Sequence, residues 1–322
     1  MLTRIVKHIH GDVDRVSAEM ISDLVQICAD NILRETMIID IHICEDEDAL
    51  HLFEKTRLED LHKLYPKTEM ISRMEPSVTG QYFLSSFSSL DFGVPEIVIV
   101  NDISKKRYSR KGLVGLIAHE VGHLKDWFER GVMTSFVTSV GPDFVHFHET
   151  LELLGDQEIR DVIFKTAMAS EEHLASEYAI SSGYHSEIFE YLISNIETNI
   201  RFQELANEPI LKELKEMRKK TSIKKVYQYQ LAGTTTYLPA IAEVCSLLEN
   251  QLSLKLEKEC VNKAFTKLTQ TTTTRFLRRS VLSLYQKSIE QPTIFHSREL
   301  VCESVFALWQ DMRSFCEDEL FD

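Results

Sequence analysis

Two histidines and a glutamate stand at the spacing of a metal-dependent hydrolase. Within Gly115–Leu124 the only polar side chains are those of His119, Glu120 and His123. Residues four positions apart lie on one face of an α-helix, so the two imidazoles can bind one metal ion together. The glutamate lies about 100° further round the helix, where its carboxylate can reach a water molecule on the metal. This H-E-x-x-H pattern predicts two zinc ligands, His119 and His123, and a general base, Glu120.

The flanking residues indicate that this helix is buried, because most of its circumference is apolar. They are Leu113, Val114, Leu116, Ile117, Ala118, Val121 and Leu124. Buried polar groups are costly without partners. Carbonyls and a carboxylate could satisfy two core histidines, but a metal ion satisfies them and uses the glutamate as well. The sequence therefore favours a metal site over an ordinary polar core.

A catalytic zinc ion needs a third protein ligand and an open position for water. The metzincin pattern would require a glycine and a histidine where this chain has Asp126 and Glu129. The cluster His146–Glu149, which reads His-Phe-His-Glu, is a second source of ligands. A third source is a glutamate on a later helix, as in gluzincins.

That later helix carries three acids, Glu171, Glu172 and Glu177, together with the small residues Ala175 and Ala179. Small residues let a helix lie close against the H-E-x-x-H helix, which brings a carboxylate within about 2 Å of the metal. Spacing alone leaves the choice among the three glutamates open.

A strand at 97–100, a loop, a buried H-E-x-x-H helix and a later E-x-x-A helix ending in Gly-Tyr together resemble the gluzincin metallopeptidases of the CAAX-prenyl-protease-like family. The resemblance covers about residues 95–185. In that family the later motif reads E-x-x-A-D and its glutamate is the third zinc ligand, which falls here on Glu172, with Ala175 after it. The family's aspartate, which orients a zinc-bound histidine, is Ser176 here, so the orienting hydrogen bond would come from a hydroxyl without charge.

The resemblance implies a zincin-like metallopeptidase with one Zn²⁺ per chain, held by His119, His123 and Glu172. The zinc ion would activate a water for attack on a peptide bond, with Glu120 as the base. We expect a peptide or protein substrate. A non-catalytic, zinc-stabilised helical interaction protein and a zinc hydrolase acting on a non-peptide amide are the alternatives.

Other features bear on substrate binding. The edge of strand 96–100 could accept an extended peptide through main-chain hydrogen bonds. Tyr184 and His185 follow the ligand helix and are candidates for stabilising the oxyanion, although a turn at the surface would also explain them. The basic run Lys212–Lys225 is typical of a solvated helix face or of a surface for an anionic partner.

The elements that must position these residues form an α+β region over 1–185. Apolar periodicity and end signals predict strands at 37–44 and 95–100, the second followed by a basic loop. The predicted helices cover 14–34, 45–64, 110–130, 147–168 and 169–182. Ser109 and Gly131 are expected to cap the 110–130 helix.

Residues 186–322 are predicted to be all-helical. They contain one glycine, Gly233, of the 11 in the chain, and 18 basic and 19 acidic residues against 18 and 31 before them. The predicted helices are 186–204, 209–220, 237–269, 275–289 and 297–317, with Tyr227–Gln230 as a short strand or loop.

Composition sets the remaining bounds on the function of this 322-residue chain. A net charge of −14 argues against general nucleic-acid binding. No apolar run reaches 18 residues, so no transmembrane segment is expected. The six cysteines are scattered without a C-x-x-C pair, which is typical of reduced thiols and predicts a cytoplasmic protein.

Overall fold

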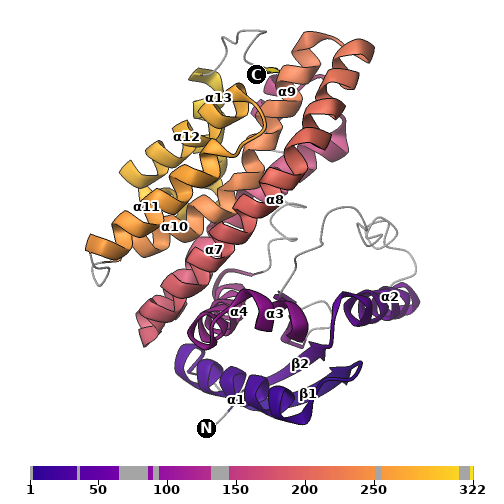
Figure 1. Ribbon diagram of the computed structural model, residues 1–322, viewed down its shortest axis with the longest axis vertical. Helices are drawn as coiled ribbons and strands as arrows, with labels where there is room; N and C mark the ends of the chain where they lie inside the picture. The colour runs from indigo at the N-terminus through magenta and orange to yellow at the C-terminus, as the bar shows by residue number, and fades with distance from the viewer. Residues whose placement is uncertain are drawn as a thin grey trace.

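The computed structural model describes residues 3–34, 37–64, 86–89, 94–131, 145–250, 255–311 and 320–321. Across these residues the chain is mainly helical with one small sheet (Figure 1), which agrees with the predicted α+β class and its helical C-terminal part.

Within the described ranges, the sheet has four strands in the order β1-β2-β4-β3. They are β1 (Arg4–His10), β2 (Ile38–Cys44), β4 (Glu96–Val100) and β3 (Ser86–Ser89). The first three run parallel, and β3 pairs antiparallel with β4. Because β4 has a neighbour on both sides, the expectation that its edge is open to a peptide is wrong.

The strands alternate their side chains between two helix layers, as the period of a β-strand requires. Ile41 and Ile97 face a core shared with α1 (Arg15–Ile32) and α4 (Arg110–Arg130). Val98 faces the opposite side, against α2 (Glu47–Leu64). The sheet therefore supports α4 from one face, and this helix carries the H-E-x-x-H residues.

The ends of α4 lie where the sequence predicts them. The Ser109 side chain accepts a hydrogen bond of 3.0 Å from the Gly112 backbone N–H, and Gly131 follows the helix with φ at +80°. The loop expected after β4 is a helix instead, α3 (Asn101–Arg107). Its acidic first turn and basic last turn complement the helix dipole, which explains why it forms.

The two helices predicted at 147–168 and 169–182 are replaced by α6 (Val145–Thr150) and one long helix, α7 (Asp156–Ala179). Met168 and Ala169 are good helix formers, so nothing stops the helix at the predicted break. A π-helical turn, Ile180–Tyr184, follows, with Gly183 at φ +100°.

The break predicted near Pro209 is also wrong, because α8 (His185–Lys220) continues through this residue. The predicted 237–269 helix is divided, and the predicted strand or loop at 227–230 is part of a helix. The C-terminal helices are α9 (Ile223–Gly233), η4 (Thr234–Tyr237), α10 (Leu238–Glu249), α11 (Lys255–Gln270), α12 (Arg275–Glu290), η5 (Pro292–His296) and α13 (Arg298–Asp311).

One hydrophobic cluster runs through both predicted regions. It includes Ile41 of the sheet, Leu116 of α4, Leu238 of α10 and Trp309 of α13. The division at residue 185 therefore falls between elements that share a core, and it stays a prediction.

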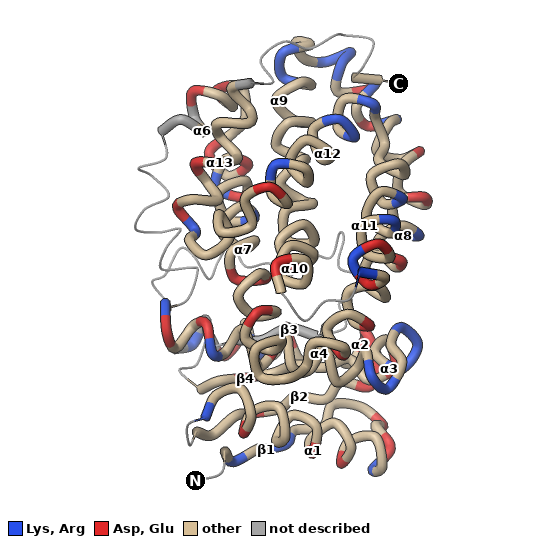
Figure 2. The backbone as a smooth tube through the Cα atoms, turned by 90° about the vertical axis from the view of Figure 1, so that its left-hand side faces the viewer, with Lys and Arg blue, Asp and Glu red and all other residues tan. Residues whose placement is uncertain are grey.

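The basic run of the sequence spans the end of α8 and the start of α9. Arg218, Lys219 and Lys220 form the last turn of α8 and are exposed. Figure 2 shows Lys and Arg gathered at this end of the molecule, opposite the sheet.

In the part of the chain that the structure describes, one helical stretch, Ile223–Glu249, is long and apolar enough to cross a membrane by length and composition. Within it, 67% of the apolar window is buried inside the structure. Core helices pass the same test, so this stretch is weak support for a membrane span.

Candidate metal centre

Helix α4 brings its two histidines together on the side that faces α7. The Nε2 atoms of His119 and His123 are 3.1 Å apart, and the rings meet edge to face. Only 2% of His119, 5% of Glu120 and 8% of His123 is exposed. The H-E-x-x-H residues thus share a nearly dry site.

Helix α7 adds the carboxylate of Glu172. Its Oε2 lies 3.0 Å from His119 Nε2 and 3.6 Å from His123 Nε2. The two helix backbones approach closely beside these residues, since a Cβ atom on Gly122 would lie 2.2 Å from the carbonyl oxygen of Ala175. A glycine and an alanine at the contact are what bring Glu172 within reach of both histidines.

Ser176, one turn after Glu172, contacts the other nitrogen of the first histidine. Its Oγ lies 3.0 Å from His119 Nδ1, and both residues are almost fully buried. When Nδ1–H donates to this hydroxyl, Nε2 carries a lone pair directed at Glu172. This is the orienting role that a partner of a metal-bound histidine plays.

The three ligand atoms fit a bound metal ion. A tetrahedral ion with bonds near 2.0–2.1 Å separates its ligand atoms by about 3.4 Å. The observed separations are 3.0, 3.1 and 3.6 Å. With Nε2 of His119 unprotonated, that nitrogen and the Glu172 carboxylate are two acceptors in contact, and a cation between them resolves this conflict.

Burial and the surrounding charges act against each other at this centre. Burial alone would lower the pKa of His123, but the carboxylates of Glu172 and Glu120 outweigh it and raise the pKa to about 10. Burial would likewise raise the pKa of Glu172, but the two histidines hold it well below its usual range. The site therefore favours positive charge beside Glu172.

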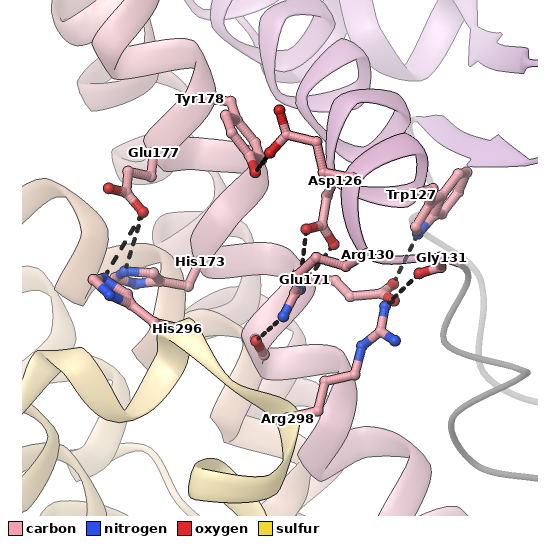
Figure 3. A network of polar contacts seen from close by, with 12 residues as sticks. Asp126, Trp127, Arg130, Gly131, Glu171, His173, Glu177, Tyr178, His296 and Arg298 are labelled. Atoms are coloured by element: carbon pink, nitrogen blue, oxygen red, sulfur yellow. Dashed lines mark hydrogen bonds and ion pairs between the residues drawn. The ribbon is translucent and has the colours of Figure 1, made fainter. Parts of the chain in front are cut away.

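The other two candidate glutamates face different partners, as Figure 3 shows. Glu171 accepts hydrogen bonds from Trp127 Nε1 at 3.1 Å and from Arg298 at 2.5 Å. Glu177 lies near His173 and His296. Of the three acids, the structure brings Glu172 to the H-E-x-x-H histidines.

The remaining sequence candidates lie outside this centre or outside the described side chains. The side chains of both histidines in His146–Glu149 are not among those described. Tyr184 accepts a hydrogen bond from Asn31 at 2.8 Å, and His185 pairs with Glu257 at 3.7 Å. Neither of these last contacts involves the metal centre.

Two residues at the centre have no counterpart in the sequence prediction. Glu243 of α10 places Oε1 3.8 Å from His119 Nε2, and Tyr191 of α8 donates a 3.0 Å hydrogen bond to this same oxygen. The Tyr191 ring also packs on His119, with centroids 5.2 Å apart. The signal for Glu243 was its position as a lone acid inside the apolar segment Ile241–Leu247, where an unpartnered carboxylate would be costly.

Burial, and to a smaller degree the charge of Glu172, raises the pKa of Glu243. The carboxyl therefore favours its neutral form more than an exposed glutamate does.

Three groups of side chains in the described part of the chain could hold a metal ion. They are His119/His123/Glu172, His173/Glu177/His296 and His8/Asp40/His42. A metal-binding capacity is therefore supported, and the first group is the one that the H-E-x-x-H pattern predicts.

No family model, no curated protein and no solved structure matches this chain.

Proposed function

We propose that this chain is a zinc-dependent metallopeptidase of the gluzincin type. His119, His123 and Glu172 would hold the zinc ion, and Glu120 would be the general base. The observation that carries the proposal is the convergence of three ligand atoms, 3.0, 3.1 and 3.6 Å apart. The buried carboxylate of Glu120 lies on the same helix as the two histidines. A purely structural site has no use for that fourth group.

The residues around the ligands have distinct roles in such a reaction. Zinc, when bound, lowers the pKa of its water toward about 7 and polarises the scissile carbonyl. Glu120 takes a proton from the attacking water and delivers it to the leaving amine. Ser176 keeps the ring of His119 in its binding orientation. Tyr191, which packs on His119, is our candidate for stabilising the oxyanion, a role that requires its O–H to turn from Glu243 toward the substrate.

The substrate would be an extended peptide. Among the described residues, strand β3 ends the sheet and contacts α4, so its outer edge is the position beside the H-E-x-x-H helix where a peptide can add. Main-chain hydrogen bonds to such an edge hold a peptide straight and read little of its sequence. This strand replaces β4 in the role that the sequence suggested.

Glu120→Gln tests the proposal directly. We expect zinc content and helical content to stay unchanged while hydrolysis of an unfolded protein such as reduced casein falls by about 10²–10⁴-fold. Glu129→Gln is the matched control, because it makes the same change on the exposed part of the same helix. Undiminished hydrolysis in Glu120→Gln would refute the catalytic role.

The alternative is a non-catalytic, zinc-stabilised helical interaction protein, and Ser176 is the observation that favours it. A neutral hydroxyl makes the zinc-bound histidine less basic than an aspartate would. If Glu120→Gln unfolds the protein, this carboxylate belongs to a structural network, and the alternative gains over the peptidase.

A further inference from the structure

We propose that His173, Glu177, Glu249 and His296 form a second metal site, which binds a zinc-like divalent cation and joins α7 to α10 and η5. None of the four belongs to the centre described above. His173 and Glu177 lie one turn apart on α7, Glu249 is the last residue of α10, and His296 ends η5.

Three of the four side chains, those of His173, Glu177 and His296, place their ligand atoms within 4.8 Å of one another, and Glu249 lies near both histidines. His173 Nε2 lies 4.0 Å from Glu177 Oε2 and 3.6 Å from Glu249 Oε2. His296 Nε2 lies 3.8 and 3.7 Å from the same two oxygens. Ligand atoms around a tetrahedral zinc ion are about 3.4 Å apart, so the side chains would rotate inward to bind one ion together.

His173 is oriented as a metal ligand. Its Nδ1 donates a 3.1 Å hydrogen bond to the carbonyl oxygen of Ala242, which leaves the lone pair on Nε2. Within the described part of the chain, this Nε2 has no hydrogen-bond partner although the side chain is 1% exposed. In Figure 3 the ring points toward Glu177 and His296. A backbone carbonyl that fixes the tautomer is typical of metal-bound histidines.

The charges also suit a cation. Two carboxylates, those of Glu177 and Glu249, face two imidazoles that are neutral when they bind a metal. Burial, and less strongly the carboxylate of Glu249, raise the pKa of Glu177 against the opposing charge of His296. The nearby Arg130 is occupied by Asp126, to which it donates at 2.6 and 2.8 Å.

The exposure of the group provides a path for the ion. The side chains of Glu177, Glu249 and His296 are 46%, 33% and 41% exposed, whereas His173 is buried. An ion can therefore arrive from solvent and be held by an anchored histidine. Four protein ligands would leave no open position, which is the arrangement of a structural zinc site. Because His173 directly follows Glu172 in the chain, an ion bound here would also hold in place the part of α7 that carries Glu172, the proposed ligand of the first metal centre.

The experiment is zinc counting on the full chain, stripped with a chelator, reloaded with Zn²⁺ and dialysed. We expect two zinc ions per wild-type chain and one in His296→Ala, with the affinity of the lost site reduced at least about 100-fold. His51→Ala is the matched control, because His51 is 47% exposed and lies 3.8 Å from Glu54. It should keep both ions.

Glu172→Ala separates this proposal from the proposed peptidase. Loss of one ion in each single variant supports both sites. If Glu172→Ala binds as much zinc as the wild type while His296→Ala loses an ion, the second site stands and the first fails.

Equal zinc in His296→Ala and the wild type would overturn the second site and leave an ion pair between a protonated His296 and the two glutamates. If His296→Ala does not fold, Glu177→Gln is the second variant, because it keeps the shape of an exposed side chain. We expect it to reduce the affinity of the second site for zinc at least about 10-fold. An unchanged affinity in Glu177→Gln would overturn the proposal equally.

Discussion

The two sides of α7 carry histidine–carboxylate clusters that are built in opposite ways. Toward α4, Glu172 meets two histidines of a single helix in a nearly dry site. Toward α10 and η5, His173 and Glu177 meet residues from two other elements, and three of the four side chains there reach solvent. One cluster thus depends on one helix contact, and the other on how three elements dock.

This difference teaches which contacts each cluster needs. The first requires α4 and α7 to approach closely, and Gly122 and Ala175 permit this. The second requires η5 and the end of α10 to stay against α7, but it tolerates a wider α4–α7 spacing. The two clusters should therefore fail separately when the corresponding contact is changed.

Gly122→Ala should have the largest effect of the changes that separate the clusters. The added Cβ would lie 2.2 Å from the carbonyl oxygen of Ala175, and a helix backbone cannot move aside as a flexible side chain can. We expect the free energy of unfolding to fall by about 3 kcal/mol, the upper part of the range for overpacking. The zinc ion of the first centre should be lost and that of the second cluster kept. Urea denaturation and zinc counting measure both.

Gly112→Ala is the control on the same helix. The nearest atom to its added Cβ lies 3.5 Å away, which is ordinary contact. Because alanine favours a helix over glycine by up to about 1 kcal/mol, this variant should be as stable as the wild type or slightly more stable. Equal stabilities for the two variants would contradict the close approach of α4 and α7.

The same contrast explains how much the sequence could predict. Two histidines at i and i+4, with Ser109 and Gly131 at the helix ends, are local signals, and α4 forms between those ends. The small residue Ala175 predicted a close helix contact, which the structure contains. These features depend on neighbours a few residues away, so periodicity and capping rules reach them.

Features that depend on distant segments were not predictable in this way. Glu243 reaches His119 from a helix far along the chain, and nothing in its local pattern says which histidine it meets. His296 likewise joins Glu177 only after η5 docks on α7. Strand β1, at the sheet edge, was missed because its sequence Arg-Ile-Val-Lys-His-Ile-His neither alternates regularly nor forms an apolar run, and none of its residues is buried.

Ser176→Ala should have a smaller effect than Gly122→Ala and should again act on one cluster. Loss of the hydroxyl removes the 3.0 Å partner of His119 Nδ1, and loss of such a partner reduces metal affinity by about 10–100-fold. Competition with a chelator would measure the change. Ser170 is a buried serine of the same helix that donates to the Phe295 carbonyl at 2.6 Å. The control variant Ser170→Ala should leave the zinc affinity of the first centre unchanged. A similar loss in both variants would point to general loosening of α7.

The group His8/Asp40/His42, with the neighbouring His10, gives the smallest expected effect. Its histidines contact one another as well as the carboxylate of Asp40. On the sheet, His10 Nε2 lies 3.0 Å from His42 Nδ1, and His8 stacks on His42 with centroids 4.7 Å apart. Burial, then the charges of His8 and His10, lower the pKa of His42 to about 3. The folded protein therefore binds fewer protons here than the unfolded chain, whose histidine titrates near about 6.5.

Stability should consequently fall as the pH drops from about 6.5 toward 3, where the unfolded chain gains a proton that the fold excludes. In the presence of a chelator, we expect the wild type to lose up to about 2 kcal/mol more than His42→Gln between pH 7 and pH 5. Urea denaturation at the two pH values measures the difference. Because the change between pH 7 and pH 5 is taken within each protein, any loss of packing caused by the substitution cancels. Identical pH slopes would mean that the pair accepts a proton despite its burial. In that case, histidines facing histidines would hold positive charge as readily as the clusters on α7, where carboxylates face them.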